Sequence, residues 1–318
     1  MNSDRRLDKK ADEAEEKLKL RTSKKNVIVT IKRKTVIIEI EDVLFHHNSA
    51  VLLPSKPEGP SSSEGITHSQ SQDSVTGLEA IKAVYLFAKD NPGKKLIIAG
   101  HTDSSGPTRY NFQLSELRAQ AVLSIITGQK NAWVDTVESK NKVEDYQHIL
   151  KHYHQLYGWN CDPGSVNNQD NEKTQEAVRN FQQIYNVEFR QSISANGRVL
   201  ASTWGAIFDL YMKELSELLG EKTIAGLQNW RMVGFLDPDR KILPCGESIP
   251  IDSPGIDGLQ SQTNRRVEFA FFDEEELPFE LKCPPSGNRR HPQKRCPLYN
   301  PKWVKHTYLT PSAVLKSS

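Results

Sequence analysis

Residues 96–127 have the sequence LIIAGHTDSSGPTRYNFQLSELRAQAVLSIIT, which changes character twice along its length. It opens with a short apolar run that ends in glycine and continues through a loop of small polar residues. It then becomes a long segment whose apolar residues recur every three or four positions, a period typical of a helix with one buried face. The stretch therefore predicts a strand, a loop and a helix in that order.

Two charged residues of this stretch are candidates for a ligand site. Asp103 follows the predicted strand, and Arg118 lies in the predicted helix. If the helix folds back beside the end of the strand, the two charges flank one small pocket. Because Arg grips a carboxylate through two parallel hydrogen bonds and Asp accepts from an ammonium, such a pair suits the zwitterionic group of an amino acid. The alternative interpretation is a salt bridge that ties the loop to the helix.

Residues 100–119, GHTDSSGPTRYNFQLSELRA, resemble the signature of the OmpA C-terminal-like peptidoglycan-binding family. The matching pattern is T-D, two residues, G, then N, two residues, L-S, two residues, R-A. In that family the aspartate and the arginine hold the amino and carboxylate ends of meso-diaminopimelate in the peptide stem, and the resemblance implies the same roles for Asp103 and Arg118. Thr102, Asn111 and Leu114 fall on positions that line the same pocket.

Three further pieces resemble strands of this family. They are the opening strand at residues 42–53 (DVLFHHNSAVLL), the glycine-containing end of the third at 245–251 (CGESIPI) and the fourth at 261–272 (SQTNRRVEFAFF). In the last piece Arg265 falls on a motif position, and the resemblance places it with the ligand-binding residues. The apolar residues of that piece alternate, as a half-buried strand requires; they are Val267, Phe269 and Phe271.

The last two strands come late, so that about a hundred residues, 129–230, interrupt the OmpA-like pattern. The helical patterns within them are residues 143–157, 173–185 and 202–219. Three helices with short turns favour a compact bundle. Residues around Phe181 and Trp204 resemble the three-helix peptidoglycan-binding module that is attached to wall hydrolases. An insertion of this size costs little at a surface loop whose ends lie close together.

These patterns predict an α+β fold: an OmpA-like βαβαβ-type sandwich of helices on a mixed sheet, interrupted by an all-α three-helix insert. The expected units are a charged tail at 1–25, a discontinuous OmpA-like domain at 26–128 and 231–275, the insert at 129–230 and a proline-rich tail at 276–318. An even number of cysteines permits disulfides, and four cysteines allow three different pairings. We expect Cys283 and Cys296 to clip the turn-rich tail, which would contribute about 3 kcal/mol, and Cys161 and Cys245 to be the remaining pair.

The sequence indicates no catalytic machinery. His148 and His152 lie one helical turn apart, but no glutamate follows the first histidine as in the hydrolytic zinc motif. There is no G-x-S-x-G motif, no C-x-x-C spacing and no cysteine beside a plausible base. We therefore expect a protein that is not an enzyme and needs no metal or other cofactor.

The amino-acid composition limits the classes of partner that this protein is expected to bind. The net charge is +2, from 42 basic and 40 acidic residues, without a basic stripe, and this pattern argues against nucleic acid. No apolar run is long enough for a transmembrane helix, and the charged N-terminus lacks the apolar core of a signal peptide. The resemblance implies peptidoglycan as the partner and the periplasm or cell envelope, at the outer membrane, as the location. The alternatives are a component or cargo of a contractile injection (type VI-like) apparatus, with secretion-apparatus or envelope proteins as partners, and a peptidoglycan hydrolase.

Overall fold

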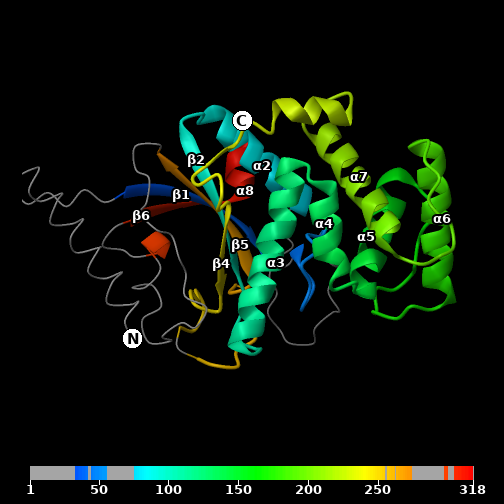
Figure 1. The fold of residues 1–318 in the computed structure, drawn as a ribbon, viewed down its shortest axis with the longest axis horizontal. Coiled ribbons are helices and arrows are strands. Elements are labelled where there is room, and N and C mark those ends of the chain that lie inside the picture. Colours follow the sequence, from blue (N-terminus) through cyan, green and yellow to red (C-terminus); the bar gives the residue numbers. More distant parts are fainter. Residues whose placement is uncertain are drawn as a thin grey trace, which may run out of the picture.

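The computed structural model describes residues 33–41, 44–55, 75–254, 256–261, 263–273, 297–299 and 304–317. These residues form an open mixed sheet with helices packed beside it, in agreement with the expected α+β class (Figure 1). The expected charged tail at 1–25 and the expected disulfide between Cys283 and Cys296 lie outside the described residues.

Within the described part of the chain, six strands form one sheet. They are β1 (Arg33–Glu41), β2 (Lys94–His101), β3 (Gly234–Phe235), β4 (Ile242–Gly246), β5 (Arg266–Asp273) and β6 (Val304–Leu309). The order is β3-β2-β5-β1-β6, and β4 pairs with β2 further along that strand. Strand β5 is antiparallel to β1 and β2, and the other pairs are parallel. Strands from both sides of the helical residues 130–218 therefore share one sheet.

Helices α2 (Gly77–Asp90) and α3 (Thr108–Thr127) pack on one face of this sheet (Figure 1). Helix α2 begins at a capping box in which the Thr76 hydroxyl accepts from the Glu79 amide and the Glu79 carboxylate accepts from the Thr76 amide. Helix α3 ends at Gly128, whose φ of 69° is the left-handed conformation that favours glycine. The structure confirms the predicted strand at β2 and the predicted helix at α3.

Four α-helices lie between helix α3 and strand β3 in the sequence. They are α4 (Lys130–Glu138), α5 (Val143–Tyr157), α6 (Glu172–Glu188) and α7 (Ala201–Leu218), followed by the short η2 (Ile224–Asn229). The last three α-helices confirm the predicted helical patterns, and α4 is an addition. Trp133 of α4 is fully buried and packs its ring against Trp204, Phe208 and Tyr211 of α7. Helix α4 therefore ties α7 to the preceding helix α3.

One hydrophobic cluster runs from the sheet through α2 and α3 into α4–α7. Phe269 of β5, Val122 of α3 and Phe208 of α7 all belong to it. Helix α6 lies at the end of the molecule farthest from the sheet (Figure 1). Residues 129–230 therefore share a core with the rest of the protein and do not close a separate one.

The C-terminal residues cover the second face of the sheet. Leu298 and Tyr299 of η5 (Pro297–Tyr299) pack with Ala270 and Phe272 of β5. Strand β6 extends the sheet beside β1, and α8 (Pro311–Ser317) packs beside α2. The prediction that residues 267–271 form a half-buried strand is wrong, because this tail buries the face that alternation alone assigned to solvent.

Residues 44–55 contain no strand, contrary to the opening strand predicted at 42–53. Asn48 has a left-handed backbone with φ of 60°, and the Leu53 amide donates to the Leu44 carbonyl at 2.8 Å. These features close the residues into a loop that packs over Arg118 of α3. We call residues 44–55 the cover segment.

Candidate functional site

The end of strand β2 is held tightly against the middle of helix α3. A Cβ added to Gly100 would lie 2.0 Å from the Ser115 carbonyl oxygen, so only glycine permits this approach. The next residue but one, Thr102, donates its amide to the Gly246 carbonyl at 2.9 Å. The loop that carries Thr102 and Asp103 therefore begins beside the N-terminal half of α3, as the strand–loop–helix prediction required.

Asp103 is buried and held by three residues. Its carboxylate accepts from the Ser105 hydroxyl at 2.6 Å, from the Ser261 amide at 3.3 Å and from the Arg265 guanidinium at 2.7 Å. Burial pushes the pKa of Asp103 upward, but the hydrogen bonds from Ser105 and Arg265 outweigh burial and hold the pKa below its usual value. Asp103 is therefore an anion at neutral pH, and Arg265 fixes its orientation.

Arg118 is completely buried on α3. Its Nε donates to the Ser49 carbonyl at 2.9 Å, its Nη2 lies 3.4 Å from the His46 carbonyl, and the Phe45 ring centroid lies 5.1 Å from its guanidinium carbon. All three residues belong to the cover segment. In this structure the guanidinium therefore fastens the cover segment to α3.

Asp103 and Arg118, the predicted ligand-binding pair, therefore contact different parts of the protein. Asp103 is 4% exposed and turns toward Ser261 and Arg265, whereas Arg118 is 0% exposed and turns toward the cover segment. A pocket between them that is open to a ligand stays a prediction, and it requires the cover segment to move.

The remaining predicted site residues lie around the same strand end. Asn111 is buried, and its amide donates to the Gly106 carbonyl at 3.0 Å and to Glu247 at 2.6 Å. Leu114 is buried one turn further along α3. The Thr102 hydroxyl is buried without a hydrogen-bond partner among the described residues, so it has unused capacity for a ligand.

Sequence reasoning missed the groups on the far side of the cover segment. The Ser49 hydroxyl donates to Asp145 of α5 at 2.7 Å, and His148 of α5 lies 3.0 Å from the Ser55 hydroxyl. Asp145 is fully buried, and burial raises its pKa to about 7. Ser49 and Asp145 lie 96 residues apart, and no local spacing pattern could have paired them.

The three histidines of α5 have separate partners. His148 faces Ser55, His152 faces Glu214 at 3.1 Å and His154 faces the Trp159 carbonyl at 2.7 Å. The described residues contain no group of three or more side chains arranged to hold a metal ion.

The expected pairing of Cys161 with Cys245 is wrong. Both residues are buried, and no disulfide joins them. Cys161 donates to the Leu150 carbonyl within the helical region, whereas Cys245 belongs to strand β4 and packs under the C-terminal tail. Their elements lie in different parts of the core, so a disulfide cannot join them.

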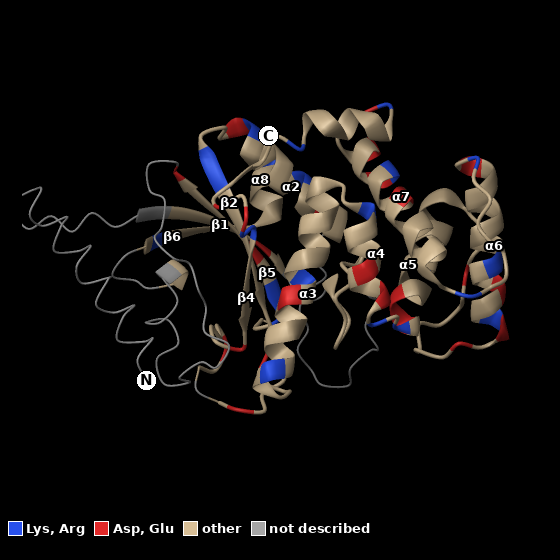
Figure 2. Cartoon of the chain, in the orientation of Figure 1, with Lys and Arg blue, Asp and Glu red and all other residues tan. Residues whose placement is uncertain are grey.

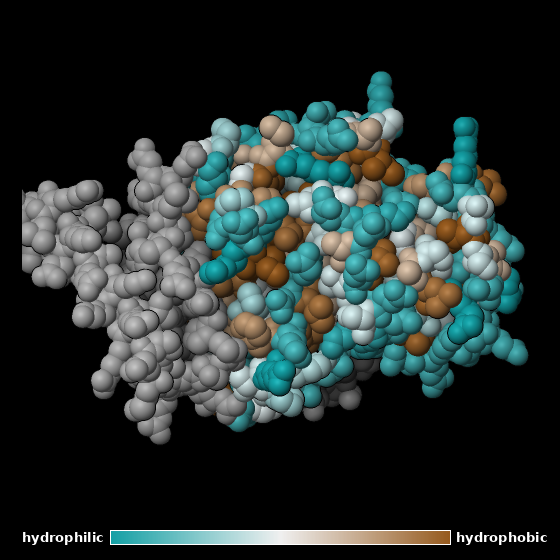
Figure 3. Space-filling view, viewed as in Figure 1, coloured by the Kyte–Doolittle hydropathy of each residue, from teal (hydrophilic) through white to brown (hydrophobic). Residues whose placement is uncertain are grey.

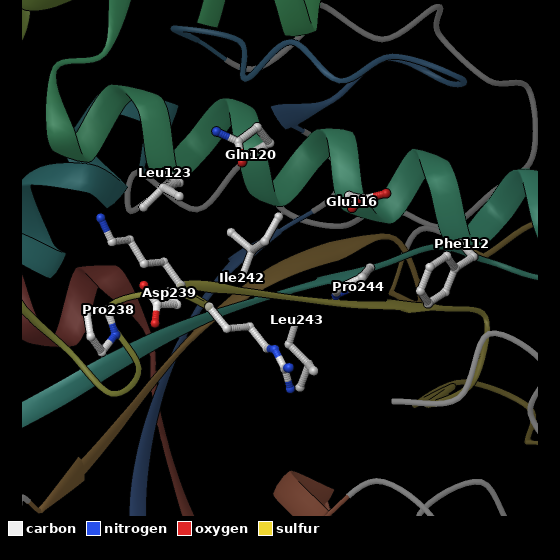
Figure 4. A pocket seen from close by; sticks show the side chains of 11 residues that line it. Phe112, Glu116, Gln120, Leu123, Pro238, Asp239, Ile242, Leu243 and Pro244 are labelled. Carbon is white, nitrogen blue, oxygen red and sulfur yellow. The ribbon is translucent and has the colours of Figure 1, made fainter. Parts of the chain in front are cut away.

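A separate groove of about 470 Å³ runs along α3 on the side of strand β4. Figure 4 shows Phe112, Glu116, Gln120 and Leu123 of α3 on one side and residues 238–244 on the other. The space-filling view shows hydrophobic atoms rimmed by hydrophilic ones in the region of α3 and β4 (Figure 3). None of the predicted site residues lines this groove.

Basic and acidic residues are interspersed over the described helices and strands (Figure 2). A nucleic-acid-binding surface typically gathers basic residues on one face. No helix among the described residues combines the length and the apolar character needed to cross a bilayer.

Comparison with known proteins finds a family match over part of the chain. Residues 70–145 match the OmpA family, so the chain carries an OmpA family domain, which includes the strand–loop–helix with Asp103 and Arg118. A curated relative is the peptidoglycan-associated lipoprotein of Legionella pneumophila, 41% identical over 49 residues. These residues are 15% of this chain and 28% of the lipoprotein, so the chain matches less than a third of that relative's length. The search of solved structures gave no significant match.

Proposed function

We propose that this chain binds peptidoglycan without acting on it chemically, and that it works in the periplasm or cell envelope. The observation that carries the proposal is the OmpA family match over residues 70–145, which covers both charged residues of the site. The name of the Legionella pneumophila relative, peptidoglycan-associated lipoprotein, supports the same partner.

The proposed ligand group is the diaminopimelate of the peptide stem. It carries an ammonium and a carboxylate on one carbon, and the anion of Asp103 and the cation of Arg118 complement these two charges. Asp103 is already oriented by Arg265, so a ligand ammonium would add one donor to a carboxylate that is fixed in place. The Thr102 hydroxyl, buried without a partner in the described part of the chain, is a further polar contact for the same group.

On the side of Asp103, hydrogen bonds between neighbouring side chains and loops hold the proposed site in a fixed arrangement before a ligand binds. Glu247 holds both the Asn111 amide and the Thr108 hydroxyl at the start of α3, at 2.6 and 2.7 Å. Ser104 accepts from the Leu259 amide at 3.1 Å and donates to the Ile256 carbonyl at the same distance. The loops around Asp103 are therefore cross-linked by hydrogen bonds and cost little to order on binding.

We also propose that residues 129–230 are an insert within an OmpA-like domain formed by 26–128 and 231–275. Support comes from strand β2 before the insert, which pairs with β3, β4 and β5 after it. Peptidoglycan binding by the insert itself stays a prediction from its resemblance to the three-helix module. The contractile-apparatus and hydrolase alternatives also stay predictions, because no contact in the described residues favours either.

Co-sedimentation with purified peptidoglycan sacculi tests the proposal. The wild-type chain should pellet with sacculi that contain diaminopimelate, whereas Asp103→Ala and Arg118→Lys should stay in the supernatant. Asp90→Ala, which removes an exposed acid at the end of α2, is the matched control and should pellet like the wild type. A wild-type chain that stays in solution, or two site variants that pellet fully, would contradict the proposal.

A further inference from the structure

Ser49 joins the cover segment to two different helices, α3 and α5. The Ser49 carbonyl accepts from Arg118 of α3 at 2.9 Å, and the Ser49 hydroxyl donates to Asp145 of α5 at 2.7 Å. Three further contacts hold the same segment to the helical region: Ser55 with His148 at 3.0 Å, the Tyr211 hydroxyl with the Leu52 carbonyl at 2.7 Å, and the Lys142 ammonium with the His47 carbonyl. Arg118 can therefore meet a ligand carboxylate only when these contacts loosen.

Asp145, which holds the cover segment through Ser49, has an unfavourable environment for its charged form. It is 0% exposed, and its Oδ1 is buried without a hydrogen-bond partner among the described residues, while Oδ2 has Ser49. A buried carboxylate that lacks partners is costly in its ionised form. Burial accordingly raises the pKa of Asp145 to about 7, and the hydrogen bond from Ser49 and the charges of Lys142 and Arg118 oppose this only in part.

We propose that Asp145 is a release group for the site: loss of its proton loosens α5 from the cover segment and opens Arg118 to a ligand carboxylate. The ligand in this statement rests on the proposed function, whereas the opening itself does not. It makes residues 129–230 a regulator of the OmpA-like site as well as a neighbour of it.

The other charged and titratable groups around Asp145 do not reverse the direction in which the loss of its proton acts on the cover segment. They are Arg118 on α3, His46 on the cover segment, Lys142, Glu144 and His148 at the start of α5, and Tyr211 on α7. Burial lowers the pKa of His148 to about 4, so His148 is neutral where Asp145 titrates, and burial also lowers the pKa of His46 below its usual value. Burial raises the pKa of Tyr211 above its normal range, so its hydroxyl is also neutral there.

The pH dependence follows from linkage. Asp145 has a pKa of 3.8 when exposed and about 7 when covered, so protonation favours the covered state. Between pH 6 and pH 8 the opening equilibrium should rise about tenfold. Above pH 8 it should be nearly constant.

Hydrogen exchange on the full chain measures this opening directly. The Ser49, Val51 and Leu53 amides donate hydrogen bonds within the cover segment and report its release. After correction for intrinsic rates, these amides should exchange about tenfold faster at pH 8 than at pH 6 in the wild type. Asp145→Asn keeps an oxygen for Ser49 but cannot ionise, and its exchange should not change with pH.

Glu144→Gln is the matched control. It removes a neighbouring acid that is only partly buried and is paired with Lys142, and it should keep the wild-type pH response. A wild type without acceleration, or Asp145→Asn with the wild-type response, would overturn the proposal.

Binding to sacculi at the same two pH values separates this proposal from the proposed function. The wild type should bind more strongly at pH 8 than at pH 6, whereas Asp145→Asn should bind weakly and equally at both. If exchange responds as stated but nothing binds sacculi, the peptidoglycan assignment fails and the release group stands. If sacculi bind but exchange does not respond, the release group fails and the assignment stands.

Discussion

Replacement of Arg118 by methionine should destabilise the protein even without any ligand. Methionine keeps much of the apolar volume but leaves the Ser49 and His46 carbonyls without the guanidinium that contacts them at 2.9 and 3.4 Å. A buried acceptor that loses a charged donor costs about 1–3 kcal/mol, and the longer contact belongs at the low end of that range. Asp145 also loses a nearby cation that lowers its pKa. The sum is about 3 kcal/mol of unfolding free energy.

Urea denaturation followed by tryptophan fluorescence measures this loss, because Trp133 and Trp204 are buried in the core. Arg240→Met is the matched control, since Arg240 is exposed beside the groove at β4 and its loss should change stability by less than about 0.5 kcal/mol. If Arg118→Met unfolds within about 1 kcal/mol of the wild type, the guanidinium does not fasten the cover segment, and the arrangement described above is refuted.

Three further predictions concern stability. Because burial raises the pKa of Asp145 from 3.8 to about 7, its contribution is complete below pH 3.8 and is lost as the pH rises to 7, at about 1.4 kcal/mol per pH unit. Urea midpoints of the wild type should fall relative to Asp145→Asn across this window, and parallel curves would contradict the shift. Tyr299→Phe removes a hydroxyl that donates to Glu268 at 2.5 Å and lies 2.8 Å from His101, and it should cost about 2 kcal/mol in the same assay; an unchanged midpoint would mean that the tail does not cover the sheet. Trp133→Ala should cost about 3–5 kcal/mol while calorimetry still shows a single transition, and two separate transitions would contradict the shared core.

Local patterns in the sequence were enough to predict much of the fold. The strand β2, the apolar period of α3, and the helices α5 to α7 each depend on residues close together in the chain. For these elements the period of the apolar residues carries the information. Helix α4 was missed because it has only nine residues and no side chain caps its first turn, so its sequence gives a weak signal.

Features made by distant residues could not be predicted in the same way. Strand β5 is buried on both faces because Leu298 and Tyr299 return from the C-terminal tail to pack on it. An alternating pattern shows which residues share a face but cannot show what covers the other face.

In the candidate site, too, the features that depend on nearby residues were predictable and those that depend on distant residues were not. The short motif that contains Asp103 and Arg118 identified both residues and the element that carries each. Their partners lie far away in sequence: Arg265 is 162 residues from Asp103, and Ser49 is 69 residues from Arg118. Burial of Arg118 under the cover segment, and with it the role of Asp145, therefore required the three-dimensional structure.

The most direct test of the central claim compares two ligands with one unaltered protein. Isothermal titration calorimetry at pH 8 would use a soluble stem peptide ending in meso-diaminopimelate and the same peptide ending in lysine, which lacks the second carboxylate. We predict that the diaminopimelate peptide binds at least about tenfold tighter, because only its side chain offers Arg118 a carboxylate on the same carbon as the ammonium that meets Asp103. Equal affinities for the two peptides, or no binding of either, would contradict it.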